Sequence, residues 1–435
     1  MAPSTTDEKT ETSNPTTDLT TSNGNSCSSK LPTWINEENF RNVLEESVPG
    51  YKKTLNFEVK ETGGGGENYA SMMMRVKAKV ELQDGSTKDI AFMIKTVPEG
   101  ELEAPMVKMM GLFPKETLMY GKYLREFEET YRSVGKEVTF GPKFYKLKND
   151  PGVEYVLLED ISTRGFKNMN RQNGLDKEHI KSVLKIVAEL HAVSAVRFVQ
   201  KGDYEESFML SPFRNETREN LEAMMKPLLK IQVDCLSKQE TGSKYLPKLK
   251  PIFDKTTEKY IEFGELNLND FNVIVHGDLW TNNIMFRHND EGKREETILI
   301  DFQLSKFATP AVDLFYFLLS SASLDIKVSC FDEFIQYYHD NLVENLKLLN
   351  YPKKIPTLKQ LRMDLMKYSF WSIAAVTGIL AAVLLDPNEN ACMNNFFDEN
   401  QEASDFQRQL FNNPRYIKHL DVLLPWMDKM GFLDD

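Results

Sequence analysis

The chain has 435 residues, of which 41% are hydrophobic and 27% are charged, and its formal net charge is −12 at pH 7. This length predicts two or three core-forming units. The negative charge argues against binding to nucleic acid or to an anionic membrane surface, because both favour basic patches. The four cysteines lie far apart without a CxxC pair, and the amino terminus lacks the apolar core of a signal peptide. We therefore expect a reduced, cytoplasmic protein without structural zinc.

Residues 1–30 consist mainly of Ser, Thr, Asn, Asp, Glu, Lys and Pro. A segment of this composition cannot bury enough apolar surface to offset the entropy lost on ordering. We interpret it as a disordered, solvated tail, with phosphorylation or partner binding as the alternative.

After the tail, Thr33 can cap a helix that runs through residues 40–44. Two stretches with alternating apolar residues, 55–59 and 72–80, predict strands, and the glycine-rich segment 63–71 joins them. Two strands joined in this way fit an ATP lid, since unencumbered backbone N–H groups can approach phosphate oxygens closely. The motif alone is weak, because four glycines are also typical of a flexible hairpin.

The strand predicted at 90–95 ends an apolar run in Lys95, whose charge is costly to bury without a counter-ion. We interpret Lys95 as the residue that binds the α and β phosphates of ATP. Its counter-ion is expected from a helix on which Phe113, Glu116 and Tyr120 share one face through i, i+3, i+7 spacing. Lys95 and Glu116 are the predicted ion pair. Three nearby carboxylates compete for the role of counter-ion: Glu126, Glu128 and Glu129.

Two more strands are predicted at 141–145 and 155–161. From Leu175 the apolar period changes from two to about 3.6, which predicts a long helix that extends to His191. This histidine could act as a base. A core histidine with backbone hydrogen-bond partners is the favoured interpretation, because a better candidate base follows.

Segment 275–286 has the sequence VHGDLWTNNIMF, and segment 298–303 has the sequence ILIDFQ. Phosphoryl transfer requires a positioned acceptor hydroxyl and Mg²⁺ on the phosphates. Asp278 would accept or orient the hydroxyl proton, and Asn283 and Asp301 offer the oxygen ligands that Mg²⁺ prefers. A lone HGD is also compatible with a capped turn, but the joint spacing is that of a kinase active site.

The segments HGDLWTNNIMF and ILIDFQLSKFATPAVDLFYFL resemble motifs of the kinase-like phosphotransferases that act on small molecules. These include choline kinases, aminoglycoside phosphotransferases and, most closely, the ecdysteroid-kinase-like group, and the resemblance covers roughly residues 31–430. Protein kinases have HRD and DFG at the corresponding places. Gly277 replaces the arginine that senses a phosphorylated activation loop, which makes a protein substrate less favoured.

The resemblance implies an α+β, two-lobed protein-kinase-like fold that uses ATP and Mg²⁺. The expected lobes are a β-rich lobe with the hinge at 31–161 and a mainly helical lobe with the catalytic loop and acceptor pocket at 162–435. The backbone at Glu159, Asp160 and Ile161 would pair with the adenine edge. Alternatively, the two acidic side chains cap the following segment.

Further roles follow from the same resemblance. Asn68, Tyr69, Ala70 and Ser71 would form the phosphate side of the lid, although the segment departs from GxGxxG. Asp313 would be the structural aspartate that accepts hydrogen bonds from the backbone of the catalytic loop.

Residues 200–270 are expected to form helices inserted into the carboxy-terminal lobe, where small-molecule kinases build an acceptor pocket. Their Met and Phe residues are ordinary core or pocket lining, and in the second case the acceptor is apolar. By resemblance, the leading acceptor is an ecdysteroid or another hydroxylated compound such as a xenobiotic. The alternatives are a choline or ethanolamine kinase, which needs an acidic or aromatic cage, and a nucleotide-binding pseudokinase, against which the complete residue set argues. No nucleic acid and no obligate protein partner are expected.

Segment 368–385 is uncharged and just long enough for a membrane span. It contains several polar residues and lacks basic anchors close on both sides, so a buried core helix is the favoured interpretation.

Overall fold

The structure, a computed structural model, describes residues 31–62, 72–97, 111–149, 151–388, 393–397 and 400–434. The predicted tail, 1–30, and the glycine-rich segment, 63–71, lie outside these ranges.

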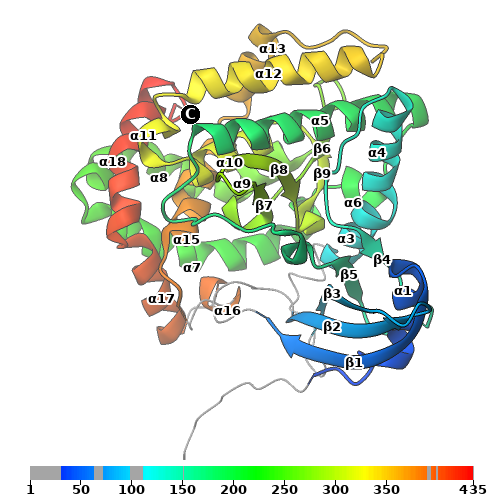
Figure 1. The fold of residues 1–435 in the computed structure, drawn as a ribbon. Coiled ribbons are helices and arrows are strands. Elements are labelled where there is room, and N and C mark those ends of the chain that lie inside the picture. The colour runs from blue at the N-terminus through cyan, green and yellow to red at the C-terminus, as the bar shows by residue number, and fades with distance from the viewer. Residues whose placement is uncertain are drawn as a thin grey trace, which may run out of the picture. The chain divides into compact units, whose positions relative to one another are not determined.

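A five-stranded antiparallel sheet with the order β1-β2-β3-β5-β4 forms the first part of the described chain (Figure 1). Along β2, alternate residues from Met72 to Val80 are buried, and those between them are exposed or half-buried. This period is expected of a strand with one face on a core. The strands are β1 (Tyr51–Glu61), β2 (Met72–Leu82), β3 (Thr87–Thr96), β4 (Phe144–Tyr145) and β5 (Tyr155–Glu159). The strands predicted around 55–59, 72–80 and 90–95 are confirmed.

Helix α1 (Glu37–Ser47) packs on this sheet, with the Phe40 ring 5.4 Å from Phe57 and 5.9 Å from Phe92 between ring centres. Its N-cap is Asn36, whose side chain accepts a hydrogen bond from the Asn39 N–H at 3.0 Å. The predicted cap, Thr33, is therefore wrong. The carbonyl of Thr33 accepts from the Asn36 side chain instead, because a turn precedes the helix.

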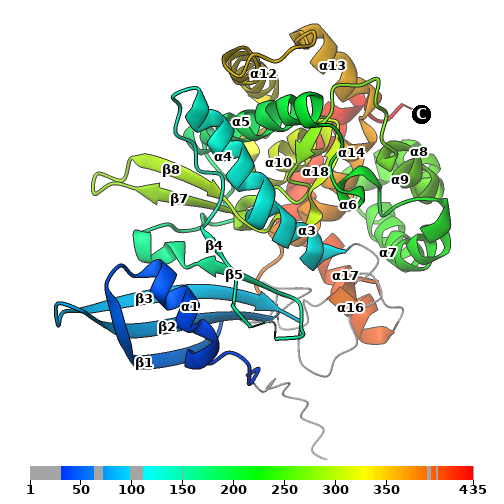
Figure 2. The same ribbon diagram turned by 90° about the vertical axis from the view of Figure 1, so that its right-hand side faces the viewer.

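The strand predicted at 141–145 is reduced to Phe144–Tyr145. Pro142 has no N–H to donate to a sheet ladder, which explains why pairing begins after it. Helix α3 (Leu112–Leu118), a π-helical turn at Met119–Tyr123 and helix α4 (Leu124–Ser133) follow one another between the sheet and the helices (Figure 2).

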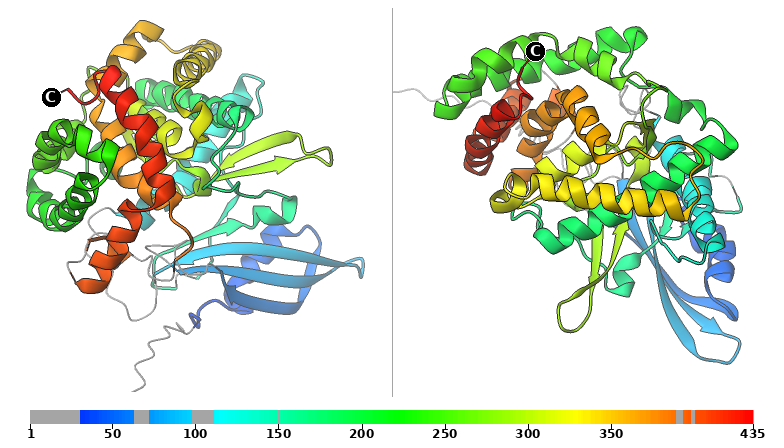
Figure 3. Two further views of the ribbon diagram at one scale, coloured as in Figure 1. Left: turned by 90° about the vertical axis from the view of Figure 1, so that its left-hand side faces the viewer. Right: turned by 90° about the horizontal axis from the view of Figure 1, so that it is seen from above.

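The helical part is built on α5 (Lys177–Lys201), the long helix predicted from Leu175. Helix α12 (Phe331–Leu348) lies along α5, as Figure 1 shows, and α18 (Pro414–Lys429) contacts both α8 and α15 (Figure 3). The remaining helices are α6 (Glu206–Met209), α7 (Arg218–Ser237), α8 (Glu240–Asp254), α9 (Thr256–Gly264), α10 (Ala311–Ser321), α11 (Leu324–Lys327), α13 (Leu358–Lys367), α14 (Phe370–Ala374), α15 (Leu380–Leu384), α16 (Met393–Phe397) and α17 (Gln401–Phe411).

Two short antiparallel pairs of strands carry the predicted catalytic segments. Strand β6 (Val273–Val275) pairs with β9 (Lys306–Ala308), and β7 (Ile284–His288) pairs with β8 (Arg294–Leu299). The loop from β6 to β7 and the turn from β8 to β9 therefore both connect one pair of strands to the other, and they lie close together, since the Ile300 N–H donates to the Asn283 carbonyl. Between residues 159 and 177 the chain forms the short helix η2 (Ile161–Arg164) and a loop.

Segment 368–385 lies in the core of the helical part, as α14, a π-helical turn at Ala375–Ile379 and α15. Val376 and Leu380 are fully buried there, and α14 and α15 contact α10. Among the described residues, no single helix combines the length and the apolar composition needed to cross a membrane. Leu358–Lys367 and Phe370–Leu384 reach that threshold only as a pair, bent by 63°.

Lys327, the last residue of α11, is fully buried. Its Nζ donates to the Leu319 carbonyl at 2.6 Å, near the end of α10, and contacts Nδ1 of His419 on α18 at 3.3 Å. The lysine thus connects the helix that follows the predicted catalytic segments to the carboxy-terminal helix.

We expect protonation of Lys327 to affect stability, because burial lowers its pKa to about 7. Between about pH 7 and the ordinary lysine pKa of 10.5, the unfolded chain holds a proton that the folded chain has released. The contribution of Lys327 to the free energy of unfolding therefore rises with pH in this window, by up to about 1.4 kcal/mol per pH unit. Urea unfolding of wild type and Lys327→Met at pH 7 and pH 9 measures this rise. Lys347→Met, at an exposed lysine of α12, is the control. If the free energies of unfolding of wild type and Lys327→Met differ by the same amount at both pH values, the prediction is contradicted.

Candidate active site

The predicted catalytic loop, which begins at His276, is held in place by Asp313, in the first turn of α10. The Asp313 carboxylate accepts hydrogen bonds from the N–H of His276 at 2.7 Å and of Gly277 at 2.9 Å. His276 Nε2 in turn lies 3.0 Å from the Ile300 carbonyl, one residue before Asp301. The supporting contacts predicted for Asp313 are confirmed, and the two segments that carry the predicted catalytic residues are joined directly.

His191 lies under this loop and is fully buried. Its Nε2 is 3.2 Å from Asp313 Oδ2, and its Nδ1 is 2.8 Å from the Tyr338 hydroxyl on α12. The interpretation of a core histidine holds, but its partners are side chains rather than backbone. Burial by itself would raise the pKa of Asp313, and the hydrogen bonds from His191 and the Gly277 N–H lower it below its ordinary value. Asp313 therefore stays ionised as an acceptor for the loop.

Gly277 occupies a position that no other residue fits. Its φ is +82°, in the left-handed region that L side chains rarely adopt. A Cβ atom there would lie 2.2 Å from the Leu304 carbonyl oxygen. The close approach of the turn at 301–305 thus excludes an arginine at position 277. This packing explains the glycine of the HGD motif.

Both oxygens of the Asp278 carboxylate have partners. Oδ2 accepts from Asn283 Nδ2 at 2.9 Å, and the same amide also donates to the Asp278 carbonyl at 3.0 Å. Oδ1 accepts from the hydroxyl of Tyr316, on α10, at 2.5 Å. Burial raises the pKa of Asp278, and the nearby carboxylate of Asp301 raises it further. Asp278 is therefore a fixed carboxylate with raised basicity.

Tyr316 is a site residue that the sequence reasoning missed. The available signal was its i+3 spacing from Asp313, which places both residues on neighbouring turns of one helix. Burial, followed by the charge of Asp278, raises the pKa of Tyr316, so its hydroxyl remains a donor.

We expect Tyr316→Phe to lower kcat about tenfold, because a hydrogen bond to a charged group contributes about 1.5–3 kcal/mol and here it orients the carboxylate that is predicted to accept the proton. The KM for ATP should not change, since the Tyr316 hydroxyl contacts Asp278 and not Lys95 or Asp301. Steady-state kinetics on the phosphorylated product test this split. Tyr337→Phe, a hydroxyl removed from α12, is the matched control. Equal kcat in both variants would show that the Tyr316 hydroxyl does not position Asp278.

Lys95 is buried and its ammonium lies between two carboxylates. Nζ is 2.9 Å from Glu116 Oε2, 2.8 Å from Asp301 Oδ1 and 2.9 Å from Gln303 Oε1. The predicted ion pair with Glu116 is present. Burial alone would lower the pKa of Lys95, but Asp301 and Glu116 together raise it above its ordinary value. Burial also raises the pKa of Glu116, to about 7.

Two of the three competing carboxylates are engaged elsewhere. Glu126 pairs with Lys201 at 2.7 Å, and Glu128 accepts from the Phe140 N–H at 3.0 Å. Gln303, which follows Asp301 by two residues, is a further contact of Lys95 to which the sequence reasoning gave no role.

Asp301 adopts the left-handed conformation, with φ +65° and ψ +65°. A non-glycine residue pays of order 1–3 kcal/mol for such a backbone, which persists only when its surroundings impose it. Tyr120 contributes to that constraint: its hydroxyl accepts from the Asp301 N–H at 3.0 Å, and its ring packs edge-on against Phe302 with the centres 5.4 Å apart. The backbone turn thereby directs the Asp301 carboxylate toward Lys95.

Asn283 and Asp301 fit the donor set that Mg²⁺ requires. The Asn283 amide nitrogen is committed to Asp278, which leaves its carbonyl oxygen as an acceptor. The Asp301 side chain keeps 29% of its surface exposed beside Lys95. The described residues contain no group of three or more His, Cys, Asp or Glu that could hold a metal ion. Two oxygen ligands suit Mg²⁺, which takes its remaining ligands from phosphate and water.

The hinge prediction needs a correction at Asp160. Its N–H donates to the Ala91 carbonyl at 3.2 Å, and its own carbonyl accepts from the Thr163 N–H. Its carboxylate pairs with Arg75 at 2.6 Å and caps η2 through the Ser162 N–H at 3.1 Å. Asp160 therefore bonds to the sheet and caps η2, because β5 continues directly into this short helix.

The N–H of Glu159 is also used, by the Lys143 carbonyl at 2.8 Å, so this donor is not available to adenine either. Ile161 stays a predicted adenine contact, as the first residue of η2. The predicted lid residues lie outside the described ranges: Asn68, Tyr69, Ala70 and Ser71.

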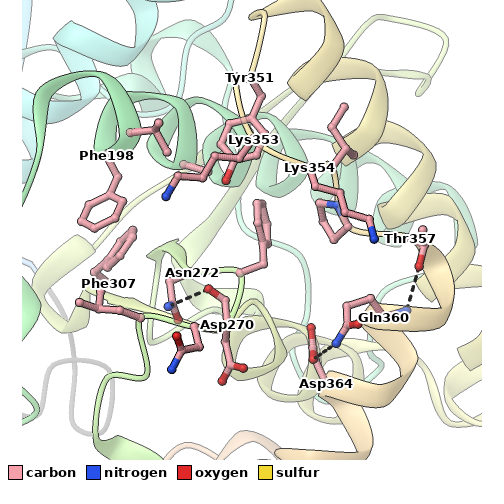
Figure 4. A pocket seen from close by; sticks show the side chains of 17 residues that line it. Phe198, Asp270, Asn272, Phe307, Tyr351, Lys353, Lys354, Thr357, Gln360 and Asp364 are labelled. Atoms are coloured by element: carbon pink, nitrogen blue, oxygen red, sulfur yellow. Dashed lines mark hydrogen bonds between the residues drawn. The ribbon is translucent and has the colours of Figure 1, made fainter.

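A cavity of about 370 Å³ lies at the other end of β6 from Asp278 (Figure 4). Phe198 from α5 and Phe307 from β9 form one wall, with their ring centres 4.4 Å apart. The carboxylate of Asp270 at its edge is already paired with Lys367 at 2.6 Å. Of the predicted acceptor segment 200–270, only the last residues line it, so this cavity is not the predicted acceptor pocket.

A family model described as the ecdysteroid kinase-like family matches residues 65–351, well over half of the chain. A search of curated proteins found no match.

Proposed function

Because the chain belongs to the ecdysteroid kinase-like family, we propose that it is an ATP- and Mg²⁺-dependent small-molecule kinase that phosphorylates an alcohol hydroxyl. The observation that carries the proposal is the convergence of Lys95, Asp278, Asn283 and Asp301 from three segments of the chain, with Asp278 and Lys95 each fixed by direct contacts. Such an arrangement holds reacting groups in place and offsets charge, which is most of what phosphoryl transfer asks of a protein.

In the proposed reaction, the acceptor oxygen forms a bond to the γ phosphorus of ATP, and the bond from that phosphorus to the bridging oxygen of ADP breaks. Asp278 receives the proton of the hydroxyl. Asn283 and Tyr316 hold its carboxylate, so that its free lone pairs have a defined direction. The raised pKa of Asp278 favours proton acceptance.

Lys95 would bind the α and β phosphates, with Glu116 keeping its ammonium in place. Asn283 and Asp301 would hold Mg²⁺, which when bound neutralises charge that develops on the phosphate oxygens. The backbone of Ile161, at the hinge, would contact adenine.

An ecdysteroid or another apolar hydroxylated compound is the proposed acceptor. Its support is a group of aromatic side chains near Asp278, within and next to the predicted acceptor segment. Tyr260 lies 5.0 Å from Phe213, 5.1 Å from Phe370 and 5.7 Å from Trp371 between ring centres. Tyr260 is also near enough to Tyr316 to affect the pKa of its hydroxyl. Phe208 and Leu221, by contrast, are ordinary core.

The experiment that tests the proposal is a mass-spectrometric search for phosphorylated product. Purified protein is incubated with Mg·ATP and a panel of ecdysteroids, other sterols, glucosides, choline and ethanolamine, with Asp278→Asn as control. A phosphorylated steroid or glucoside that is lost in the variant supports the proposal. Binding of Mg·ATP without product from any acceptor would favour the pseudokinase.

We expect Asp301→Ala to weaken binding of Mg·ATP by at least about tenfold, since the variant loses one of two protein ligands of the metal. Calorimetric titration with Mg·ATP, and with ATP in the presence of a chelator, measures this. Asp270→Ala is the matched control, because that carboxylate is paired with Lys367, away from the proposed nucleotide site. Unchanged affinity in Asp301→Ala would show that its metal role is wrong.

A further inference from the structure

Two lysines, the buried Lys115 and the half-buried Lys306, lie close to the predicted active site without an ion-pair partner among the described residues. Lys115 is the residue before Glu116 on α3 and is 4% exposed. Lys306 is half-buried and begins β9, three residues after Gln303. Neither lysine forms an ion pair with any residue that the structure describes. Other buried charges of the site, such as Lys95 and Asp313, are paired.

Lys306 lies against the aromatic group described above. Its Nζ is 4.7 Å from the centre of the Trp371 ring, and that ring lies 5.7 Å from Tyr260 in an edge-on arrangement. The indole nitrogen of Trp371 is buried and has no hydrogen-bond partner among the described residues. We call Lys306, Trp371 and Tyr260 the acceptor-side cluster. It combines flat apolar surface with N–H donors for which the described part of the chain offers no acceptor.

The acceptor-side cluster adjoins the reacting carboxylate. In the β6–β9 pair, Lys306 is opposite Val275, three residues before Asp278. Tyr260 lies near Tyr316, whose hydroxyl donates to Asp278. A molecule whose hydroxyl contacts Asp278 can therefore extend over Trp371 and reach the ammonium of Lys306.

The electrostatics of this region favour an anion. Burial, followed by the positive charge of Lys115, lowers the pKa of Lys306 to about 8, against a smaller opposing effect of the Asp313 carboxylate. Burial likewise lowers the pKa of Lys115 to about 8. Two like charges removed from water without an ion-pair partner are unfavourable, and an incoming anion would reduce that cost. A cationic acceptor would add a third positive charge beside them.

We propose that Lys306 determines acceptor specificity by binding an anionic oxygen group of the acceptor. The acceptor is then a hydroxylated ring compound that carries a carboxylate or similar anion, lies on Trp371 and Tyr260, and presents its hydroxyl to Asp278. Amino alcohols such as choline are excluded by the same charge. This inference rests on the proposed function.

The probes are cholate, a hydroxylated steroid carboxylate, its uncharged methyl ester, and choline. Calorimetric binding, below the concentration at which cholate forms micelles, and turnover with Mg·ATP are measured for wild type, Lys306→Met and Lys306→Arg. Lys181→Met is the matched control, because Lys181 also lies over an aromatic ring, Tyr337 at 5.5 Å, but is paired with Glu333. We expect wild type to prefer cholate to its methyl ester. Lys306→Met should raise the Kd for cholate at least about tenfold and abolish the preference, and Lys306→Arg should retain it.

The outcomes separate the inference from the proposed function. Phosphorylation of cholate and its methyl ester at equal rates in wild type, or equal losses for both in Lys306→Met, would overturn the inference and leave the kinase proposal intact. Lys306-dependent binding of cholate without any phosphorylated product would support the anion site and count against the kinase. A Kd for Mg·ATP that rises in Lys306→Met would overturn the inference by assigning the lysine to the nucleotide phosphates. Absence of cholate binding to wild type would also overturn it.

Discussion

Asp278→Asn is expected to lower kcat by at least about a hundredfold, because a positioned base contributes about 10²–10⁴-fold to such a step. Asparagine has nearly the same shape as aspartate, so the side chain should keep its position while its hydrogen bonds lose the contribution of the negative charge. Its carbonyl oxygen can still accept from either Asn283 or Tyr316, but it cannot take the proton of an acceptor hydroxyl. Binding of Mg·ATP should be retained, since Lys95 and Asp301 are untouched.

Single-turnover measurement of phosphorylated product, together with the Kd for Mg·ATP, distinguishes this outcome from misfolding. Asp270→Asn is a suitable control: that carboxylate precedes β6, and its ion pair is with Lys367, away from the catalytic loop. If Asp278→Asn keeps turnover within about tenfold of wild type, Asp278 is not the residue that accepts the proton.

Gly277→Ala is expected to disrupt the catalytic loop, with a loss of stability of about 2 kcal/mol or more and a fall in kcat of at least about a hundredfold. The added Cβ would lie 2.2 Å from the Leu304 carbonyl oxygen, and backbone must move to relieve the contact. The backbone that would move lies beside Asp301 on one side and Asp278 on the other, so both predicted catalytic groups would be displaced.

The matched control is Gly292→Ala, in the turn between β7 and β8. Its φ is +77°, so an alanine pays a similar conformational cost, but nothing lies within 4 Å of the added Cβ. Chemical unfolding and kinetics on both variants isolate the effect of the contact with Leu304. Equal losses in the two variants would show that the left-handed backbone, and not the packing of the two segments, explains the glycine.

Local patterns in the sequence sufficed for much of the fold and for the polar residues of the site. The alternation of β2 and the long apolar period of α5 follow from backbone periodicity, which depends on neighbouring residues only. Lys95 and Glu116 could be paired because a buried lysine at a strand end requires a counter-ion. The Asp278 to Asn283 interval is likewise a local property of one loop.

The start of α1 and the use of the hinge could not be determined in the same way. Thr33 and Asn36 are both good caps, and the turn made with the Asn36 side chain selects between them. The sequence around Asp160 is compatible both with an adenine contact at the hinge and with a cap of the following segment. The ion pair with Arg75, on β2, fixes Asp160 against the sheet. In both cases the sequence permits two arrangements, and contacts with other residues decide.

The sequence by itself determined which chemical groups are available and the order in which they enter the site, because motif spacing and periodicity are properties of consecutive residues. Only the tertiary structure decided which groups meet. Tyr316 reaches Asp278, and Lys95 meets Asp301 and Gln303 across more than 200 residues. Lys306 lies beside Trp371 and has no ion-pair partner in the described part of the chain. These contacts depend on how β6, β9, α10 and α14 pack, and the free energy of that packing is spread over the whole core rather than encoded in any one segment.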